Sequence, residues 1–377
     1  MDIKLLLRLM AEKNASDLFF STGAPPHMKI EGVSTPMGSG PLPPGAIKDI
    51  AYKLMDAQQI KEFEENWEAN FALAADGVGR FRVNVFKQRG EVGIVMRHIK
   101  TNIPVLETLK LPPIVKNLIM ERVGLVLVCG PTGSGKSTSL ASLLDYRNRR
   151  ETGHILTIED PIEFLHDHKM SIVDQREIGV DTKSFHNALK NAMREAPDVI
   201  LIGEIRDSEA MEYALNYAQT GHLVLATIHG NNCRQVLDRI RNLFPQDMRG
   251  HVMKELSSVL KGIISQRLVR GVGGMRVPAV EIMMMAPDIN EIIQRGYLED
   301  LPKAIEKNYV DGMRTFDQSL FDLYKANLIT KDDALHYAES KTDLSLRMRL
   351  GEAGGSKDAS SQFSVPAEKT NPFKTEL

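Results

Sequence analysis

Residues 130–138, GPTGSGKST, have the residue types and spacing of a phosphate-binding loop. Glycines at these places let the backbone turn so that successive N–H groups, at the start of a helix, point at phosphate oxygens. The lysine brings positive charge to the β- and γ-phosphates, and the serine after it offers a hydroxyl to Mg²⁺. An apolar run at 124–128 precedes the loop and a helical pattern follows it. We therefore expect a nucleoside triphosphate to bind through Gly130, Thr132, Gly133, Ser134, Gly135, Lys136, Ser137 and Thr138.

Carboxylates follow two apolar segments further along the chain. DVILIGEIRD, at 198–207, reads as a buried strand that ends near Glu204. The carboxyl ends of parallel strands line the ligand crevice of an α/β sheet, so Glu204 is placed to hold Mg²⁺ together with Ser137, partly through water. TIEDPIE, at 157–163, sets three carboxylates where they would act on the metal or on the attacking water. An ion-paired glutamate and an acidic surface loop are the purely structural alternatives.

A histidine stands at each end of the apolar segment GHLVLATIH, at 221–229. Zinc is not favoured, because the separation of His222 from His229 spans most of a strand and nearby donors lack a metal spacing. His229, at the carboxyl end, suits a sensor of the terminal phosphate. For His222, a hydrogen-bonded core histidine is the alternative.

Segments 81–87 and 91–97 alternate apolar and polar residues around Arg89-Gly90, which predicts a β-hairpin. A two-residue turn would oppose these pairs: Arg82 and Arg97, Val83 and Met96, and Val85 and Ile94. Like charges directly opposite each other destabilise a sheet. We therefore expect an anion beside the two arginines, the alternative being two solvated arginines on an exposed face.

Apolar runs that alternate with helical patterns predict an α/β core with a mostly parallel sheet. The expected strands are 124–129, 155–158, 171–174, 199–202 and 223–227, and an amphipathic helix is expected over 251–268. The chain of 377 residues then divides into an α+β unit at 1–100, a proline-containing linker at 101–113 and the core at 114–285. A helical region at 286–345 follows, and the polar tail at 346–377 is predicted to be disordered.

Composition excludes several other classes of protein. A net charge of −2 argues against a broad electrostatic grip on nucleic acid. The two cysteines, Cys129 and Cys233, can build neither a disulfide framework nor a cysteine zinc site, which fits a reducing cytoplasm. Because no apolar run approaches 18 residues, we expect attachment to a membrane only through a partner.

The four segments GPTGSGKST, TIEDPIE, DVILIGEIRD and TGHLVLATIH, in this order, resemble the secretion-ATPase superfamily of type II secretion and type IV pilus motors. The resemblance covers about residues 1–345, and the family calls these segments the Walker A, Asp, Walker B and His boxes. It implies a PAS-like N-terminal domain, a RecA-like P-loop core, a homo-hexamer and hydrolysis of ATP with Mg²⁺. It further implies that Glu163 activates water, that Glu204 is the Walker B acid, and that Arg82 and Arg97 reach the nucleotide. His222 and His229 match the His box.

Two departures from the superfamily pattern point to one branch. The chain lacks the tetracysteine motif and the extra N-terminal domain of extension and secretion members, which favours the PilT/PilU retraction ATPases. The basic motif of PilT-type members is replaced at Asn290, Gln294 and Tyr297, which makes the chain resemble the PilU type. The implied role is to power or assist pilus retraction in twitching motility beside a PilT-like paralogue. The implied place is the cytoplasmic side of an inner-membrane platform protein.

Other functions of a P-loop core remain as alternatives. A secretion or extension ATPase of the same superfamily would share all four segments. A RecA-like nucleic-acid translocase would need a basic surface with aromatic residues for stacking, and we expect no nucleic-acid partner. A small-molecule kinase would need an acceptor pocket and a lid.

Overall fold

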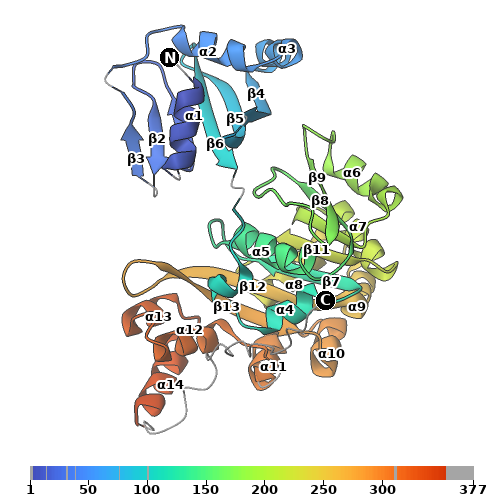
Figure 1. Ribbon diagram of the computed structural model, residues 1–377. Coiled ribbons are helices and arrows are strands. Elements are labelled where there is room, and N and C mark those ends of the chain that lie inside the picture. Colours follow the sequence, from blue (N-terminus) through green and yellow to red (C-terminus); the bar gives the residue numbers. More distant parts are fainter. Residues whose placement is uncertain are drawn as a thin grey trace, which may run out of the picture.

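The computed structural model describes residues 3–13, 15–30, 33–38, 40–75, 77–99, 102–309 and 312–353. It contains two units, each built on its own β-sheet (Figure 1). The first unit holds a six-stranded antiparallel sheet in the order β3-β2-β1-β6-β5-β4. Its elements are α1 (Ile3–Glu12), β1 (Asp17–Phe20), β2 (His27–Ile30), β3 (Val33–Pro36), α2 (Ala46–Leu54), α3 (Ala57–Asn66), β4 (Glu68–Ala75), β5 (Gly79–Gln88) and β6 (Glu91–Ile99).

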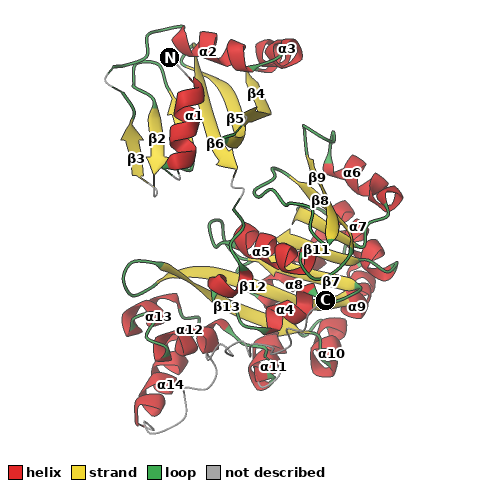
Figure 2. Ribbon diagram, viewed as in Figure 1, coloured by secondary structure: helices red, strands yellow, loops and turns green. Residues whose placement is uncertain are grey.

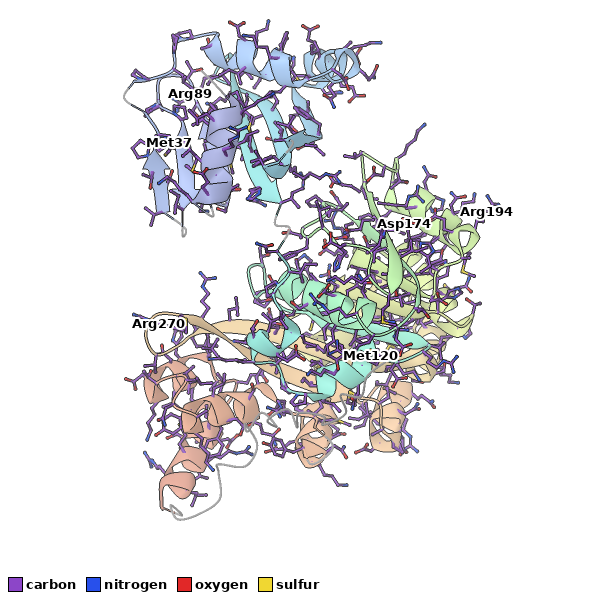
Figure 3. All side chains as sticks on the ribbon, in the orientation of Figure 1. Met37, Arg89, Met120, Asp174, Arg194 and Arg270 are labelled. Carbon is purple, nitrogen blue, oxygen red and sulfur yellow. The ribbon has the colours of Figure 1, made fainter. Side chains whose placement is uncertain are left out.

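The predicted hairpin is confirmed as β5 and β6, with the expected register. Arg82 lies opposite Arg97, Val83 opposite Met96 and Val85 opposite Ile94. Arg89 and Gly90 have φ values of 48° and 82°, as a two-residue turn with two positive φ angles requires. Figure 3 shows Arg89 at this end of the unit. Buried side chains of the two strands, including Val83, Val85 and Ile94, pack in one hydrophobic core with buried side chains of α1 and α2.

Three strands of this unit lie where the sequence predicts turns or no element. β2 and β3 fall within residues 23–45, whose prolines and glycines predict turns, and all four residues of β3 are exposed. β4 pairs with β5 along its whole length, but its buried and exposed residues alternate irregularly. β3 and β4 are the two edge strands of this sheet, and β2, next to β3, has only four residues. Such strands carry little apolar periodicity of their own, because pairing with the neighbouring strand holds them.

The second unit holds a seven-stranded sheet in the order β13-β12-β7-β11-β10-β8-β9. Its strands are β7 (Gly124–Cys129), β8 (Gly153–Glu159), β9 (Ser171–Glu177), β10 (Val199–Ile205), β11 (Leu223–Ile228), β12 (Leu260–Arg270) and β13 (Arg276–Met284). Its helices are α4 (Ile114–Ile119), α5 (Lys136–Asn148), α6 (Phe185–Ala192), the 3-10 turn η2 (Met193–Glu195), α7 (Ser208–Gln219), α8 (Cys233–Leu243) and α9 (Arg249–Val259). All neighbouring strands are parallel except β12 and β13. The mostly parallel α/β fold is therefore confirmed.

Helices cover both faces of this sheet (Figure 2), and the residues of β7 show why. All six residues of β7 are buried. Leu125, Leu127 and Cys129 face one hydrophobic cluster, whereas Val126 and Val128 face the other. A strand that is buried on both faces needs an unbroken apolar run, which is what precedes the phosphate loop.

The helix predicted over 251–268 is wrong in its second half. α9 ends at Val259, and β12 then pairs in parallel with β7 and antiparallel with β13. The apolar residues of 260–264 fit a period of two as well as of 3.6, so the open edge of β7 decides their structure. A Cβ at Gly262 would come within 2.7 Å of the Met283 carbonyl oxygen, which shows how closely the strands approach. Figure 3 shows Arg270 near the tip of the β12–β13 hairpin.

Helices close the chain after β13. They are α10 (Pro287–Arg295), η3 (Leu298–Asp300), α11 (Leu301–Lys307), α12 (Phe316–Lys325), α13 (Lys331–Tyr337) and α14 (Lys341–Ala353). Residues 346–353 thus belong to a helix and not to the predicted tail, of which 354–377 lie outside the described residues. The predicted linker carries a 3-10 turn, η1 (Leu106–Leu109). Within the described ranges, every helix is too short or too polar to cross a membrane.

Candidate nucleotide-binding site

Four neighbouring parallel strands, β7, β11, β10 and β8, end at the same edge of the seven-stranded sheet. The phosphate loop follows β7 and His229 follows β11. Glu204 is the next-to-last residue of β10, and Asp160 comes directly after β8. The strand order therefore brings the four predicted segments together, although they are spread over 100 residues of the sequence, 130–229. Ligands of open α/β sheets bind at this edge.

At several positions of the phosphate loop, only glycine fits the backbone conformation or the available space. Gly130, Gly133 and Gly135 have φ values of 145°, 76° and 85°. A Cβ at Gly130 would collide with the carbonyl oxygen of Gln266, whereas the space over Gly133 is open. The Ser134 hydroxyl is buried without a hydrogen-bond partner. Such an arrangement of glycines and an unsatisfied hydroxyl fits a phosphate group.

Lys136 lies folded over the loop. Its Nζ donates to the carbonyl oxygens of Gly130, at 2.8 Å, and Pro131, at 3.1 Å. Burial lowers the pKa of this lysine, while the nearby Cys129 and Glu204 raise it. The ammonium group is therefore bound by neutral carbonyl oxygens. The charged oxygens of a triphosphate would take their place and form stronger hydrogen bonds.

Gln266 of β12 holds the loop from behind, and the sequence analysis did not find it. Its Nε2 donates to the Ser134 carbonyl oxygen at 2.8 Å, and its Oε1 accepts from the Ser139 hydroxyl at 2.7 Å. Gln266 lies within the helix predicted over 251–268, and that pattern does not connect it with the loop. The signal for its role would have been a buried glutamine in a strand rich in β-branched residues, beside the strand that leads into the phosphate loop.

Side chains from three of the four segments form one connected network. The Glu204 carboxylate pairs with His229 Nε2 at 2.6 Å and with Arg206 Nε at 2.5 Å. Arg206 Nη1 lies 3.4 Å from the Asp160 carboxylate. The exposed Ser137 hydroxyl and the Glu204 carboxylate are oxygen donors of the kind that Mg²⁺ prefers.

Glu163 is exposed, and its neighbour Glu159 is the carboxylate that the fold encloses. Glu159 Oε1 accepts from Thr157 Oγ1 at 2.7 Å and from Gln175 Nε2 at 3.2 Å, and the Glu163 backbone N–H donates to the same carboxylate. Burial raises the pKa of Glu159 to about 7. Glu159 thus anchors the backbone that carries Glu163, a role that the acidic cluster alone did not reveal.

The enclosed Glu159 carboxyl should make stability depend on pH. Its pKa in the folded chain, about 7, lies above the ordinary 4.5. The proton on Glu159 therefore makes its full contribution to the free energy of unfolding below pH 4.5. That contribution is lost as the pH rises through 7. We expect Glu159→Gln to be more stable than wild type by about 1–3 kcal/mol at pH 8, with a smaller difference at pH 4.5. Urea unfolding at both pH values measures this, and an unchanged difference would contradict the raised pKa.

His222 lies at the opposite edge of the sheet from His229. It precedes β11, and its Nδ1 lies 3.1 Å from the Tyr217 carbonyl oxygen and 3.3 Å from Thr220 Oγ1. The structure therefore does not bring His222 to the phosphate loop of its own chain, and its contacts are those of a hydrogen-bonded structural histidine.

Of the two predicted arginines of the first unit, Arg97 has an ion-pair partner within the chain, whereas Arg82 acts only on the pKa of Glu177. Arg97 Nε donates to the buried Asp17 carboxylate at 2.8 Å, an anion that contacts Arg97 alone and not both arginines as expected. Arg80 Nη2 lies 3.9 Å from Glu177 of β9, and both Arg80 and Arg82 oppose the rise that burial causes in the pKa of Glu177. Among the described residues, no hydrogen bond or ion pair joins Arg82 or Arg97 to the phosphate loop.

Comparisons with known proteins agree with this geometry. Residues 43–296 match the family described as "Type II/IV secretion system protein". The chain is 49% identical over 352 residues to the type IV pilus ATPase PilU of Pseudomonas aeruginosa, which covers 93% of this chain and 92% of that protein. It is 42% identical over 339 residues to the type IV pilus retraction ATPase PilT of the same organism, covering 90% and 98%.

A solved structure extends the likeness to three dimensions. The crystal structure of the pilus retraction motor PilT with bound ADP superimposes with a TM-score of 0.86 at 41% identity, over 92% of this chain and 99% of that one. The chain therefore belongs to the type II/IV secretion system protein family, as a P-loop ATPase of its PilT/PilU pilus branch.

Proposed function

We propose that this chain is a pilus retraction ATPase that binds ATP with Mg²⁺ in a hexameric ring and assists a PilT-like motor. The observation that carries the proposal is the meeting of the phosphate loop, Glu204 and His229 at one sheet edge. The relatives along nearly the whole chain support a pilus motor over the nucleic-acid translocase and the small-molecule kinase considered from the sequence. They also support the retraction branch over a secretion or extension ATPase.

Each part of the site has a proposed role in hydrolysis. The loop N–H groups hold the phosphates, while Lys136 moves from the Gly130 carbonyl to the phosphate oxygens. Ser137 and Glu204 would hold Mg²⁺, which offsets negative charge on the phosphates when bound. Glu163, on its exposed loop, accepts a proton from the attacking water. His229 reports the terminal phosphate through its contact with Glu204.

A ring completes this site with residues from a neighbouring copy. Arg82 and Arg97 belong to a different unit from the phosphate loop, so a neighbouring subunit can bring them to the nucleotide. Head-to-tail contacts that close into a ring offer every subunit such a neighbour. The proposed partner beyond the ring is the inner-membrane platform protein of the pilus. The chain would therefore be cytoplasmic and reach the membrane peripherally through that machinery.

The accessory role rests on α10 and on Tyr297 just after it, where the PilT-type motif has basic residues. Asn290 Nδ2 donates to the Ser257 carbonyl oxygen at 3.1 Å, and Gln294 Nε2 donates to the Ser257 hydroxyl at 3.2 Å. Both amides are therefore engaged with α9, and Tyr297 is 59% exposed and uncharged. The three positions therefore lack the positive charges that the PilT-type motif would present there.

We expect a strain in which this chain is the sole retraction ATPase to retract few pili. The reason is that the three replaced positions lack the charge of the PilT-type motif. Retraction events per cell, counted with labelled pili, measure the effect, and a strain with both ATPases is the control. Frequent retraction by this chain alone would contradict the accessory role but leave the ATPase assignment intact.

A further inference from the structure

Residues 229–233, named here the histidine loop, connect the nucleotide edge to the C-terminal helices. The loop starts at His229, which contacts Glu204 at 2.6 Å. It ends at the start of α8, where the Asn232 side chain caps the helix by accepting from the Gln235 N–H at 2.9 Å. Only two residues separate the proposed phosphate sensor from this cap. A shift of the cap would therefore move the backbone that leads to His229.

Two charged side chains hold the middle of the histidine loop. Arg267 Nη2 donates to the Asn231 carbonyl oxygen at 3.1 Å and to Glu339 Oε1 at 2.9 Å. The same Glu339 oxygen accepts from Asn232 Nδ2 at 3.1 Å. The side chains of Arg267 and Glu339 are 21% and 35% exposed, so solvent screens this pair less than a fully exposed one.

The two charges come from different parts of the fold. Arg267 belongs to β12, a strand of the core sheet, two residues after Ser265. The Ser265 hydroxyl also donates to the Asn231 carbonyl oxygen at 3.1 Å. Glu339 comes from the segment between α13 and α14. Contacts from both the core sheet and the C-terminal region therefore hold the histidine loop.

Glu339 is itself fixed to α12. The backbone N–H groups of Glu339 and Ser340 donate to the two oxygens of Asp317 at 2.8 Å and 2.9 Å. The Arg267 guanidinium stacks on the Phe316 ring, 3.9 Å from its centroid. Phe316 and Asp317 are the first two residues of α12. A movement of α12 against the core would therefore displace Glu339 and, through it, Asn232.

We propose that Glu339 and Arg267 are positioning residues that set His229 against Glu204, and so couple the C-terminal helices α12–α14 to ATP hydrolysis. This inference rests on the proposed function, because the coupling requires that this chain hydrolyse ATP. Energetic coupling needs an element that both sites bias, and the histidine loop is in contact with both. The consequence is that force on the C-terminal helices changes the rate of hydrolysis without touching the nucleotide.

The test compares Glu339→Gln with Glu306→Gln in the full-length protein. Glu306 pairs with Arg347 and so joins α11 to α14, but it does not contact the histidine loop. We expect Glu339→Gln to lower kcat roughly 10-fold, while the Kd of a fluorescent ATP analogue changes less than about 2-fold. Glu306→Gln should leave both values unchanged. Arg267→Lys keeps the charge but has fewer donors, so its kcat should fall between wild type and Glu339→Gln.

A double variant separates coupling through His229 from a general structural effect. In the His229→Ala background, Glu339→Gln should lower kcat no further, because the residue through which it acts is gone. An additive loss, or an unchanged kcat in Glu339→Gln alone, would overturn the proposal.

Hydrogen exchange provides a readout that does not depend on catalysis. Backbone amides in peptides covering 229–235 should exchange faster in Glu339→Gln than in wild type or Glu306→Gln. Unchanged exchange would overturn the proposed link even if ATP is hydrolysed. A wild-type protein that does not hydrolyse ATP would instead refute the proposed function, and exchange would still decide whether Glu339 holds the loop.

Discussion

Lys136→Ala is expected to abolish ATP hydrolysis, with a loss of at least roughly 10²–10³-fold in kcat. Lys136 is the lysine of the phosphate loop, and its ammonium group lies on the Gly130 and Pro131 carbonyls, within the loop that would hold the phosphates. Alanine leaves the phosphate charge uncompensated at the place where it grows during transfer. Release of inorganic phosphate by the purified protein measures the effect.

The loss should be specific to Lys136. Its hydrogen bonds join groups within one loop, so the midpoint of thermal unfolding should stay close to that of wild type. Lys303→Ala, on the exposed face of α11, removes a lysine far from the loop in sequence and should keep full activity. Wild-type turnover in Lys136→Ala would remove the basis for assigning the phosphate loop.

Glu163→Gln is expected to stop hydrolysis while leaving ATP and Mg²⁺ bound. An amide cannot take the proton of the attacking water, and loss of a general base costs about 10²–10⁴-fold in rate. The Glu163 side chain is exposed, so its replacement should not disturb the fold. Single-turnover hydrolysis, measured together with binding of a fluorescent ATP analogue, separates the chemical step from affinity.

Glu204→Gln should give a different result from Glu163→Gln. It removes the charge that pairs with His229 and Arg206, and the Mg²⁺ concentration needed for half-maximal binding should rise. Glu151→Gln changes an exposed carboxylate away from the sheet edge and serves as the control. If Glu163→Gln hydrolyses ATP normally while Glu204→Gln binds Mg²⁺ normally but does not react, the two roles are reversed.

Local patterns predicted those parts of the fold that local physics determines. β7 and β11 are buried on both faces, so their apolar runs marked them to within a residue. The β5–β6 register followed from the two-residue turn at Arg89-Gly90. The phosphate loop was evident because its glycines, lysine and serine are consecutive. In each case the residues that determine the structure lie next to one another in sequence.

Long-range contacts determined the features that the sequence did not reveal. β12 forms because the edge of β7 is open to it, and Gln266 reaches Ser134 across 132 positions. Asp17 meets Arg97 through the pairing of β1 with β6, which no local pattern encodes. Each of these features depends on which strands become neighbours.

A nucleotide site shared between neighbouring subunits of a ring can be detected by mixing two variants that are each expected to be inactive. Lys136→Ala has an intact Arg82, and Arg82→Ala has an intact phosphate loop. If the site lies between subunits, each variant should hydrolyse ATP poorly alone. Equal mixing before assembly should restore about a quarter of the sites, because random neighbours then place an intact loop beside an intact arginine. Full activity of Arg82→Ala alone, or a mixture no more active than its parts, would contradict a shared site.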